Sequence, residues 1–154
     1  MAQGKKIFTI GHSNRNIEDL ANILRVYDIA LLADVRSFPG SQKWPQFNKQ
    51  FLSSYLQQVS ISYIHMPLLG GKIPVSGGYT AYMQTQTFHK AIAELEQRSL
   101  ECNTAYMCAE ANWRDCHRSH ISNFLEQKGW QVIHIKSAEI SEQHFITPKQ
   151  GKLF

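Results

Sequence analysis

The sequence predicts a single α/β domain with three α/β/α layers and a mostly parallel, Rossmann-like sheet of about five strands. Short apolar runs rich in Val and Ile alternate with longer segments of helical period, which is typical of repeated β-α units. The 154 residues, 43% of them hydrophobic, are enough for one domain with a substantial core. We therefore expect one domain over 1–154, with its core at about 6–136 and a polar tail at 137–154.

Five strands are expected from apolar runs that are short and mostly lack alternation, as strands buried on both faces do. They lie at 6–10, 29–35, 62–66, 104–108 and 131–135. Four helices are expected between the strands. They run from a cap at Asn16, over about 48–59, over about 79–98, and from Asp115 as N-cap to Lys128, where Gly129 follows the end.

Two long segments, 36–47 and 67–78, fit neither pattern and are rich in Pro and Gly. Both directly follow predicted strands. Loops of this length in a compact domain are usually functional, so we expect them to border a ligand site.

The composition limits the classes of function. The first apolar run is too short for a signal sequence or a membrane span, and three cysteines suit a reducing compartment. We expect a cytoplasmic monomer or small homo-oligomer without membrane attachment. The net charge of +4 favours an anionic partner, such as a small substrate, a nucleotide or a nucleic acid, although dispersed charges also serve solubility.

Polar and glycine residues follow four of the predicted strands. In open parallel sheets, ligands bind at the carboxyl ends of the strands, so we expect these residues to share one pocket. The substrate-binding candidates are His12 and Ser13 after the first strand, Asp34, Arg36 and Ser41 after the second, and Gly70 and Gly71 after the third.

The densest group lies after the fourth strand and contains Cys108, Glu110, Cys116, His117 and Arg118. With Asp115 as N-cap, the last three would occupy a first helical turn, which attracts anions. A basic side chain there opposes the helix dipole, which favours an anion-binding role for Arg118. A cysteine would be the nucleophile or redox thiol, and Glu110 or His117 would transfer protons.

Structural interpretations of the same residues stay open. Either cysteine could be a small buried apolar residue, Glu110 a surface carboxylate, and Asp34 a partner for an arginine. The Cys108-x5-Arg114 spacing matches a phosphatase loop only weakly, because the intervening residues lack glycine. Aromatic residues in or beside the loops could stack a base or simply pack: Trp44, Phe47, Tyr79, Tyr82 and Trp113.

Together the motifs resemble the domain-of-unknown-function family DUF488 over about 6–136. The motifs are Gly11-His12-Ser13, Asp34-Val35-Arg36 with Pro39 and Ser41, Leu69-Gly70-Gly71, Cys108-Ala109-Glu110 and Cys116-His117-Arg118. The resemblance implies a small bacterial or archaeal α/β protein with a shared polar pocket, and it implies no particular reaction. In this pattern the arginine is the one that follows Cys-His, so Arg114 gains no support.

Three hypotheses follow. The first is an enzyme without a cofactor, either a thiol-dependent or a general acid–base hydrolase or transferase, acting on a phosphate-bearing or nucleic-acid-derived substrate. The second is a non-catalytic module that binds or senses a nucleotide or nucleic acid. The third is a zinc-stabilised interaction domain with ligands among Cys108, Cys116, His117 and His12, although their spacing is unlike that of zinc fingers.

Overall fold

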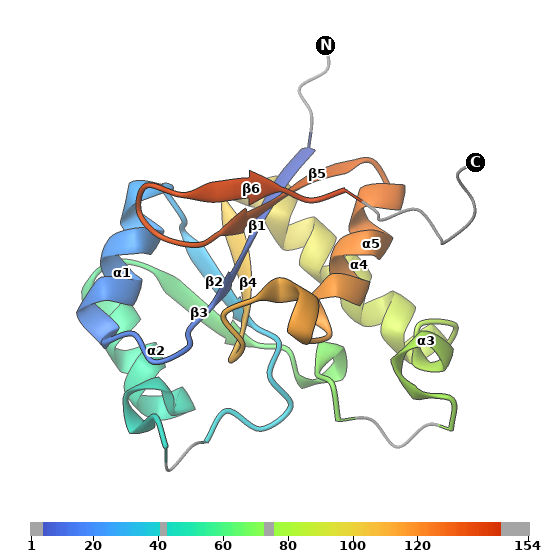
Figure 1. Ribbon diagram of the computed structural model, residues 1–154, viewed down its shortest axis with the longest axis horizontal. Coiled ribbons are helices and arrows are strands. Elements are labelled where there is room, and N and C mark those ends of the chain that lie inside the picture. Colours follow the sequence, from blue (N-terminus) through green and yellow to red (C-terminus); the bar gives the residue numbers. More distant parts are fainter. Residues whose placement is uncertain (1–4, 41–42, 73–75, 146–154) are drawn as a thin grey trace.

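The centre of the molecule is a six-stranded sheet in the order β3-β2-β4-β1-β5-β6 (Figure 1). The computed structural model describes residues 5–40, 43–72 and 76–145. Five strands are mutually parallel, and β6 pairs antiparallel with β5. The strands are β1 Lys5–Gly11, β2 Leu31–Asp34, β3 Ser62–His65, β4 Thr104–Cys108, β5 Trp130–Ile135 and β6 Ser141–Gln143. The predicted three-layer, mostly parallel α/β architecture is confirmed.

Helices cover both faces of the sheet (Figure 1). The α-helices are α1 Ile17–Val26, α2 Lys49–Gln58, α3 Gly78–Tyr82, α4 Gln86–Glu101 and α5 Arg118–Gln127. Alternate residues of β1 point to opposite faces: Phe8 packs with the apolar side chains of α1 and α2, whereas Ile7 packs with those of α4 and α5. Each face of the sheet therefore has its own apolar cluster. None of the described helices is long and apolar enough to cross a membrane.

Three short 3-10 helices lie in the loops that follow the strands. They are η1 Pro45–Phe47, η2 Pro67–Leu69 and η3 Trp113–Asp115. The first two fall within the long segments that the sequence left without regular structure, and the third precedes α5.

The third predicted helix, over 79–98, is wrong as one unit. The chain forms α3 and α4, and the hydroxyl of Thr85 accepts a hydrogen bond from the Phe88 N–H at the start of α4. Such a side-chain cap starts a new helix, because it satisfies a backbone donor that has no partner within the helix. The apolar period continued across the break and concealed it.

The start of the fourth predicted helix is also wrong. Asp115 ends η3, Cys116 has extended backbone with φ −147°, and α5 begins only at Arg118. Cys116 therefore lies in a connecting turn and not in the first helical turn. The predicted end is confirmed, since Gly129 follows the helix with φ +97°.

Strand β6 lies in the predicted polar tail, so the expectation of about five strands missed it. Its three residues are polar and at least partly exposed, and no apolar alternation marks them. The backbone N–H of His144 continues the pairing by donating to the Val132 carbonyl (2.8 Å). An edge strand of this kind depends on its neighbour for hydrogen bonds, which a local pattern does not reveal.

Candidate functional site

The carboxyl ends of β1, β2 and β4 meet at one edge of the sheet, as the sequence predicts. Gly11 at the end of β1 is in register with Cys108, and Asp34 at the end of β2 is in register with Met107. A Cβ atom on Gly11 would lie 1.8 Å from the Glu110 carbonyl oxygen. Only glycine therefore lets the end of β1 pass so close to the turn that carries Glu110.

The pairing of these chains continues past the strands. The backbone N–H of His12 donates to the Cys108 carbonyl and that of Ser13 to the Ala109 carbonyl, each at 3.0 Å. The loops after β2 and β3 are equally close, since a Cβ on Gly70 would lie 2.2 Å from Ser37 Oγ. The loops after β1, β2, β3 and β4 are thus in direct contact.

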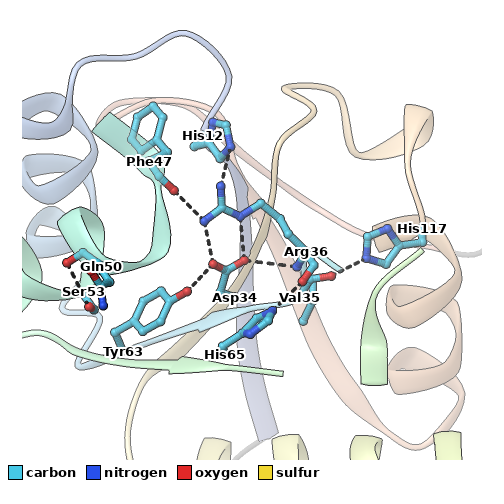
Figure 2. A network of polar contacts seen from close by, with 10 residues as sticks. All are labelled: His12, Asp34, Val35, Arg36, Phe47, Gln50, Ser53, Tyr63, His65 and His117. Atoms are coloured by element: carbon cyan, nitrogen blue, oxygen red, sulfur yellow. Dashed lines mark hydrogen bonds and ion pairs between the residues drawn. The ribbon is translucent and has the colours of Figure 1, made fainter. Parts of the chain in front are cut away.

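A closed polar network surrounds Asp34, which is fully buried (Figure 2). Arg36 donates to its carboxylate through Nε (2.8 Å) and Nη2 (2.7 Å), and Nη2 also donates to the Phe47 carbonyl (2.8 Å). Tyr63 donates its hydroxyl to Asp34 Oδ2. Burial and the nearby carboxylate raise the pKa of Tyr63, so the hydroxyl keeps its proton.

His12 completes this network and is itself buried. Its Nδ1 lies 2.9 Å from the Ser13 carbonyl and its Nε2 lies 3.2 Å from Arg36 Nη1, so Nδ1 carries the proton and Nε2 accepts. The ring stacks on Phe47 with centroids 4.3 Å apart. Burial lowers the pKa of His12 to about 4, so the ring is neutral near pH 7.

A second buried network is built around Arg118, which is only 1% exposed. Its Nη1 donates to Thr9 Oγ1 (3.0 Å), and its Nη2 donates to the carbonyls of Glu110 (2.7 Å) and Ala111 (3.3 Å). Nε has no hydrogen-bond partner among the described residues. The guanidinium thus holds the turn after β4 against β1.

From Thr9 the hydrogen bonds continue through two histidines. Thr9 Oγ1 lies 2.7 Å from His134 Nδ1, His134 Nε2 lies 2.9 Å from His144 Nδ1, and His144 Nε2 lies 2.7 Å from Asn123 Oδ1. With Thr9 as donor, each ring donates through Nε2 and accepts through Nδ1. Burial lowers the pKa of His134 to about 2 and that of His144 to about 4, so both are neutral. This series of hydrogen bonds was not predicted from the sequence.

The thiols of Cys108 and Cys116 lie close together beside Arg118. Cys108 Sγ lies 2.7 Å from Cys116 Sγ, and all three cysteines of the chain are free. The Arg118 backbone N–H also lies 3.4 Å from Cys116 Sγ. The Cys108 hydrogen bond, with smaller contributions from Arg118, lowers the pKa of Cys116 to about 6 despite burial. The same hydrogen bond and burial raise the pKa of Cys108, so Cys108 is the S–H donor.

The thiols lie in the wall of an open pocket of about 490 Å³. Its described lining residues are Arg36, Ser37, Phe38, Gly71, Lys72, Cys108, Ala109, Glu110, Cys116 and His117. A second hollow of about 440 Å³ shares four of them and continues toward Tyr79 and His120. Cys116 and His117 therefore face a groove with two lobes.

His117 is oriented by the second strand. Its Nε2 donates to the Val35 carbonyl (2.9 Å), as Figure 2 shows, which leaves Nδ1 as the acceptor of the neutral ring. Burial lowers the pKa of His117. A Cβ on Gly71 would lie 3.1 Å from Nδ1, so the glycine leaves this nitrogen uncrowded on the pocket wall.

All four candidates for a catalytic role lie in the pocket wall: Cys108, Glu110, Cys116 and His117. Glu110 is exposed on this wall. Of the substrate-binding candidates, Arg36 and Gly71 line the pocket, whereas His12, Ser13, Asp34, Gly70 and Arg118 lie behind or beside it. Ser41 lies outside the described residues.

Several alternatives lose their geometric basis. Arg114 stacks on Trp113 and lies 3.7 Å from Glu142, so it does not face Cys108 as a phosphatase arginine would. Across the described parts of the chain, no group of three or more His, Cys, Asp or Glu is placed to hold a metal ion. Of the five aromatic residues considered for stacking, Phe47, Tyr82 and Trp113 are buried.

Besides Ala109, three pocket residues were not among the sequence candidates, namely Ser37, Phe38 and Lys72. They follow strands within the two long loops, so their position along the chain was the available signal. Ser37 Oγ accepts from the Lys72 N–H (2.9 Å), which joins the two loops. Nothing in the sequence marks Tyr63 or Thr9 as network residues, because their partners lie far away along the chain.

The fold and this geometry define a class: a three-layer α/β domain with a thiol-bearing pocket at the carboxyl edge of its sheet. Residues 16–125 match the family described as domain of unknown function DUF488, and the chain belongs to that family. No curated protein and no solved structure matches the chain. The matched segment contains Arg36, Cys108, Cys116 and His117, so the family match includes the pocket.

Proposed function

We propose that this chain is a thiol-dependent enzyme of hydrolase or transferase type, with Cys116 as its nucleophile. The observation that carries the proposal is the position of the Cys116 sulfur, in a pocket wall and 2.7 Å from a second thiol. A thiolate attacks whereas a thiol does not, and the hydrogen bond from Cys108 lowers the pKa of Cys116, which favours its thiolate. Cys108 stabilises that thiolate by donating its S–H.

His117 is the candidate proton carrier. It neighbours Cys116 along the chain, it lines both lobes of the groove, and its ring is held by Val35. A neutral imidazole with an accepting Nδ1 can take a proton from a substrate hydroxyl or water and return it to a leaving group. Glu110 is on the same wall and is a second candidate for this role.

An anionic substrate, phosphate-bearing or derived from a nucleic acid, fits the charges of the pocket. Arg36 and Lys72 line it, Glu110 is the one carboxylate among its described lining residues, and Arg118 is buried behind the thiols. The charge of Arg36 is balanced by Asp34, whereas the guanidinium of Arg118 is hydrogen-bonded, among the described residues, only to neutral groups and acts by its charge from behind the thiols. Lys72 is exposed and is the candidate for direct contact with the anion.

Alkylation of the thiols across pH tests the proposal. In a Cys102→Ser protein, iodoacetamide should modify Cys116 with an apparent pKa near 6, well below the reference of about 8.5. Inorganic phosphate or a nucleoside monophosphate should slow the reaction. Unreactive thiols, or an ordinary pKa at Cys116, would contradict the enzyme. Binding of the nucleotide without such a reactive thiol would instead indicate a non-catalytic sensor.

A further inference from the structure

We infer that Cys108 and Cys116 form a two-electron dithiol/disulfide couple that exchanges with small acidic disulfides, with Cys116 as the attacking thiol and Cys108 as the resolving thiol. The inference rests on the proposed function, because it uses the same nucleophile. It goes further by giving Cys108 a covalent role and by naming a substrate class.

The geometry of the two sulfurs carries the inference. They are 2.7 Å apart, whereas a disulfide bond is about 2.05 Å long, so bond formation needs a movement of less than one ångström. Cys108 is fixed at the end of β4 and is 3% exposed. Cys116 lies in the turn between η3 and α5, outside either helix, where a small side-chain movement changes only the long contact of its sulfur with the Arg118 N–H at the start of α5.

The two thiols differ in the way that exchange requires. Cys116 is more exposed than Cys108, and its pKa is lowered, so it is the sulfur that an incoming disulfide meets as a thiolate. Cys108 is buried and protonated, which prevents its direct attack on a substrate in the pocket. It remains within reach of one electrophile, the Cys116 sulfur.

The exchange balances without another reactant. The Cys116 thiolate attacks one sulfur of a disulfide R–S–S–R, the S–S bond breaks, one R–S⁻ leaves, and Cys116 carries the other R–S group as a mixed disulfide. Cys108 then gives its proton to the departed thiolate and attacks Cys116 Sγ, which releases the second R–S⁻. Two electrons and one proton pass from the Cys108–Cys116 pair to the substrate, which becomes one thiol and one thiolate, and the thiolate takes its proton from water.

The pocket walls favour an acidic substrate. Lys72 lines the pocket, and Arg118, whose guanidinium is hydrogen-bonded only to neutral groups within the described parts of the chain, lies behind Cys116. These two positive charges face one carboxylate among the described lining residues, Glu110, since the charge of Arg36 is balanced by Asp34. Phe38, which is 74% exposed, supplies an apolar surface. A basic disulfide bound beside Cys116 would be repelled by the same positive charges. Charge should therefore separate acidic from basic disulfides of similar size.

The test uses oxidised glutathione as the acidic disulfide and cystamine as the basic one, on a Cys102→Ser protein and its Cys108→Ser derivative. The Cys102→Ser protein should release two thiols per chain and retain no glutathione. The Cys108→Ser derivative should release one and retain glutathione on Cys116. At equal concentration, oxidised glutathione should react at least several-fold faster than cystamine.

Peptide mapping under non-reducing conditions identifies the bond. Trypsin cleaves after Arg114 and so separates Cys108, in 99–114, from Cys116, in 115–118. The two peptides should be joined in the oxidised Cys102→Ser protein, where Cys102 can no longer compete within the first peptide. Retention of glutathione by both proteins would overturn the resolving role of Cys108 but leave the proposed function intact. Failure of Cys116 to react with either disulfide or iodoacetamide would overturn both, and equal rates for the two disulfides would overturn the acidic substrate class.

Discussion

Two groups at the carboxyl edge of the sheet, the Asp34 network and the Cys108–Cys116 thiol pair, differ in how far they are closed off from the pocket. At the end of β2, the Asp34 network is buried, and arginine, tyrosine and histidine side chains surround the carboxylate. At the end of β4, Cys116 is partly exposed beside a pocket of about 490 Å³. A satisfied buried network fixes geometry, whereas a reacting group needs an open side. Under the proposed function, the end of β2 serves structure and the end of β4 serves chemistry.

Lowering the pH should have the largest effect on stability, because it protonates buried histidines in the Asp34 network and in the network around Arg118. The folded-state pKa is lowered to about 4 for His12 and His144 and to about 2 for His134. The unfolded chain, with a histidine pKa near 6.5, therefore binds protons first as the pH falls. Stability is complete above pH 6.5 and is lost as the pH falls to about 4 for His12 and His144 and to about 2 for His134, by up to about 1.4 kcal/mol per pH unit for each histidine.

Urea denaturation at a series of pH values measures this loss. The midpoint should fall steeply below pH 6.5 at constant ionic strength. A free energy of unfolding that stays level from pH 6.5 to 4 would show that these histidines are not held neutral in the folded protein.

Removal of Asp34 should have the next largest effect. Asp34→Ala leaves the guanidinium of Arg36 buried without its carboxylate, which should lower the free energy of unfolding by about 3–5 kcal/mol. Asp19→Ala, at an exposed position in α1, is the matched control and should cost much less. If both variants lose the same small amount, the network around Asp34 contributes little to folding.

The hydroxyl of Tyr63 should contribute less than the carboxylate that it contacts. Tyr63→Phe removes a hydrogen bond to a charged acceptor and should cost about 1.5–3 kcal/mol. Tyr27→Phe removes one to the neutral carbonyl of Ser137 and should cost about 0.5–1.5 kcal/mol. Equal losses in thermal or urea unfolding would contradict a charge-assisted bond at Tyr63.

The thiol pair should show the smallest effect on stability and a clear effect on reactivity. Cys108→Ala should cost only about 1 kcal/mol, since it removes one buried sulfur. It should also raise the apparent pKa of Cys116 from about 6 toward the reference of about 8.5, because the Cys108 hydrogen bond is the main cause of the lowering. Cys102→Ala, measured by the same alkylation profile, should leave the pKa of Cys116 unchanged.

The sequence alone determined the fold class and the location of the pocket. The strand at 104–108 was predicted with the bounds that the structure has, and the cap at Asn16 is confirmed by its hydrogen bond from the Asp19 N–H. These features are local, because a strand's apolar run or a cap involves residues close together in the chain. The meeting of Gly11 with Cys108 followed from the general rule that parallel strands end at a common edge.

The tertiary structure alone decided which residues face the pocket and what each one contacts. Arg118 lies in a first helical turn as predicted, but its guanidinium is buried against Thr9 and two carbonyls, whereas Cys116 and His117 precede the helix. The Cys108–Cys116 contact, β6 and the His134–His144 pair also required coordinates. Each depends on the direction of side chains or on pairing between segments that the chain's local period does not encode.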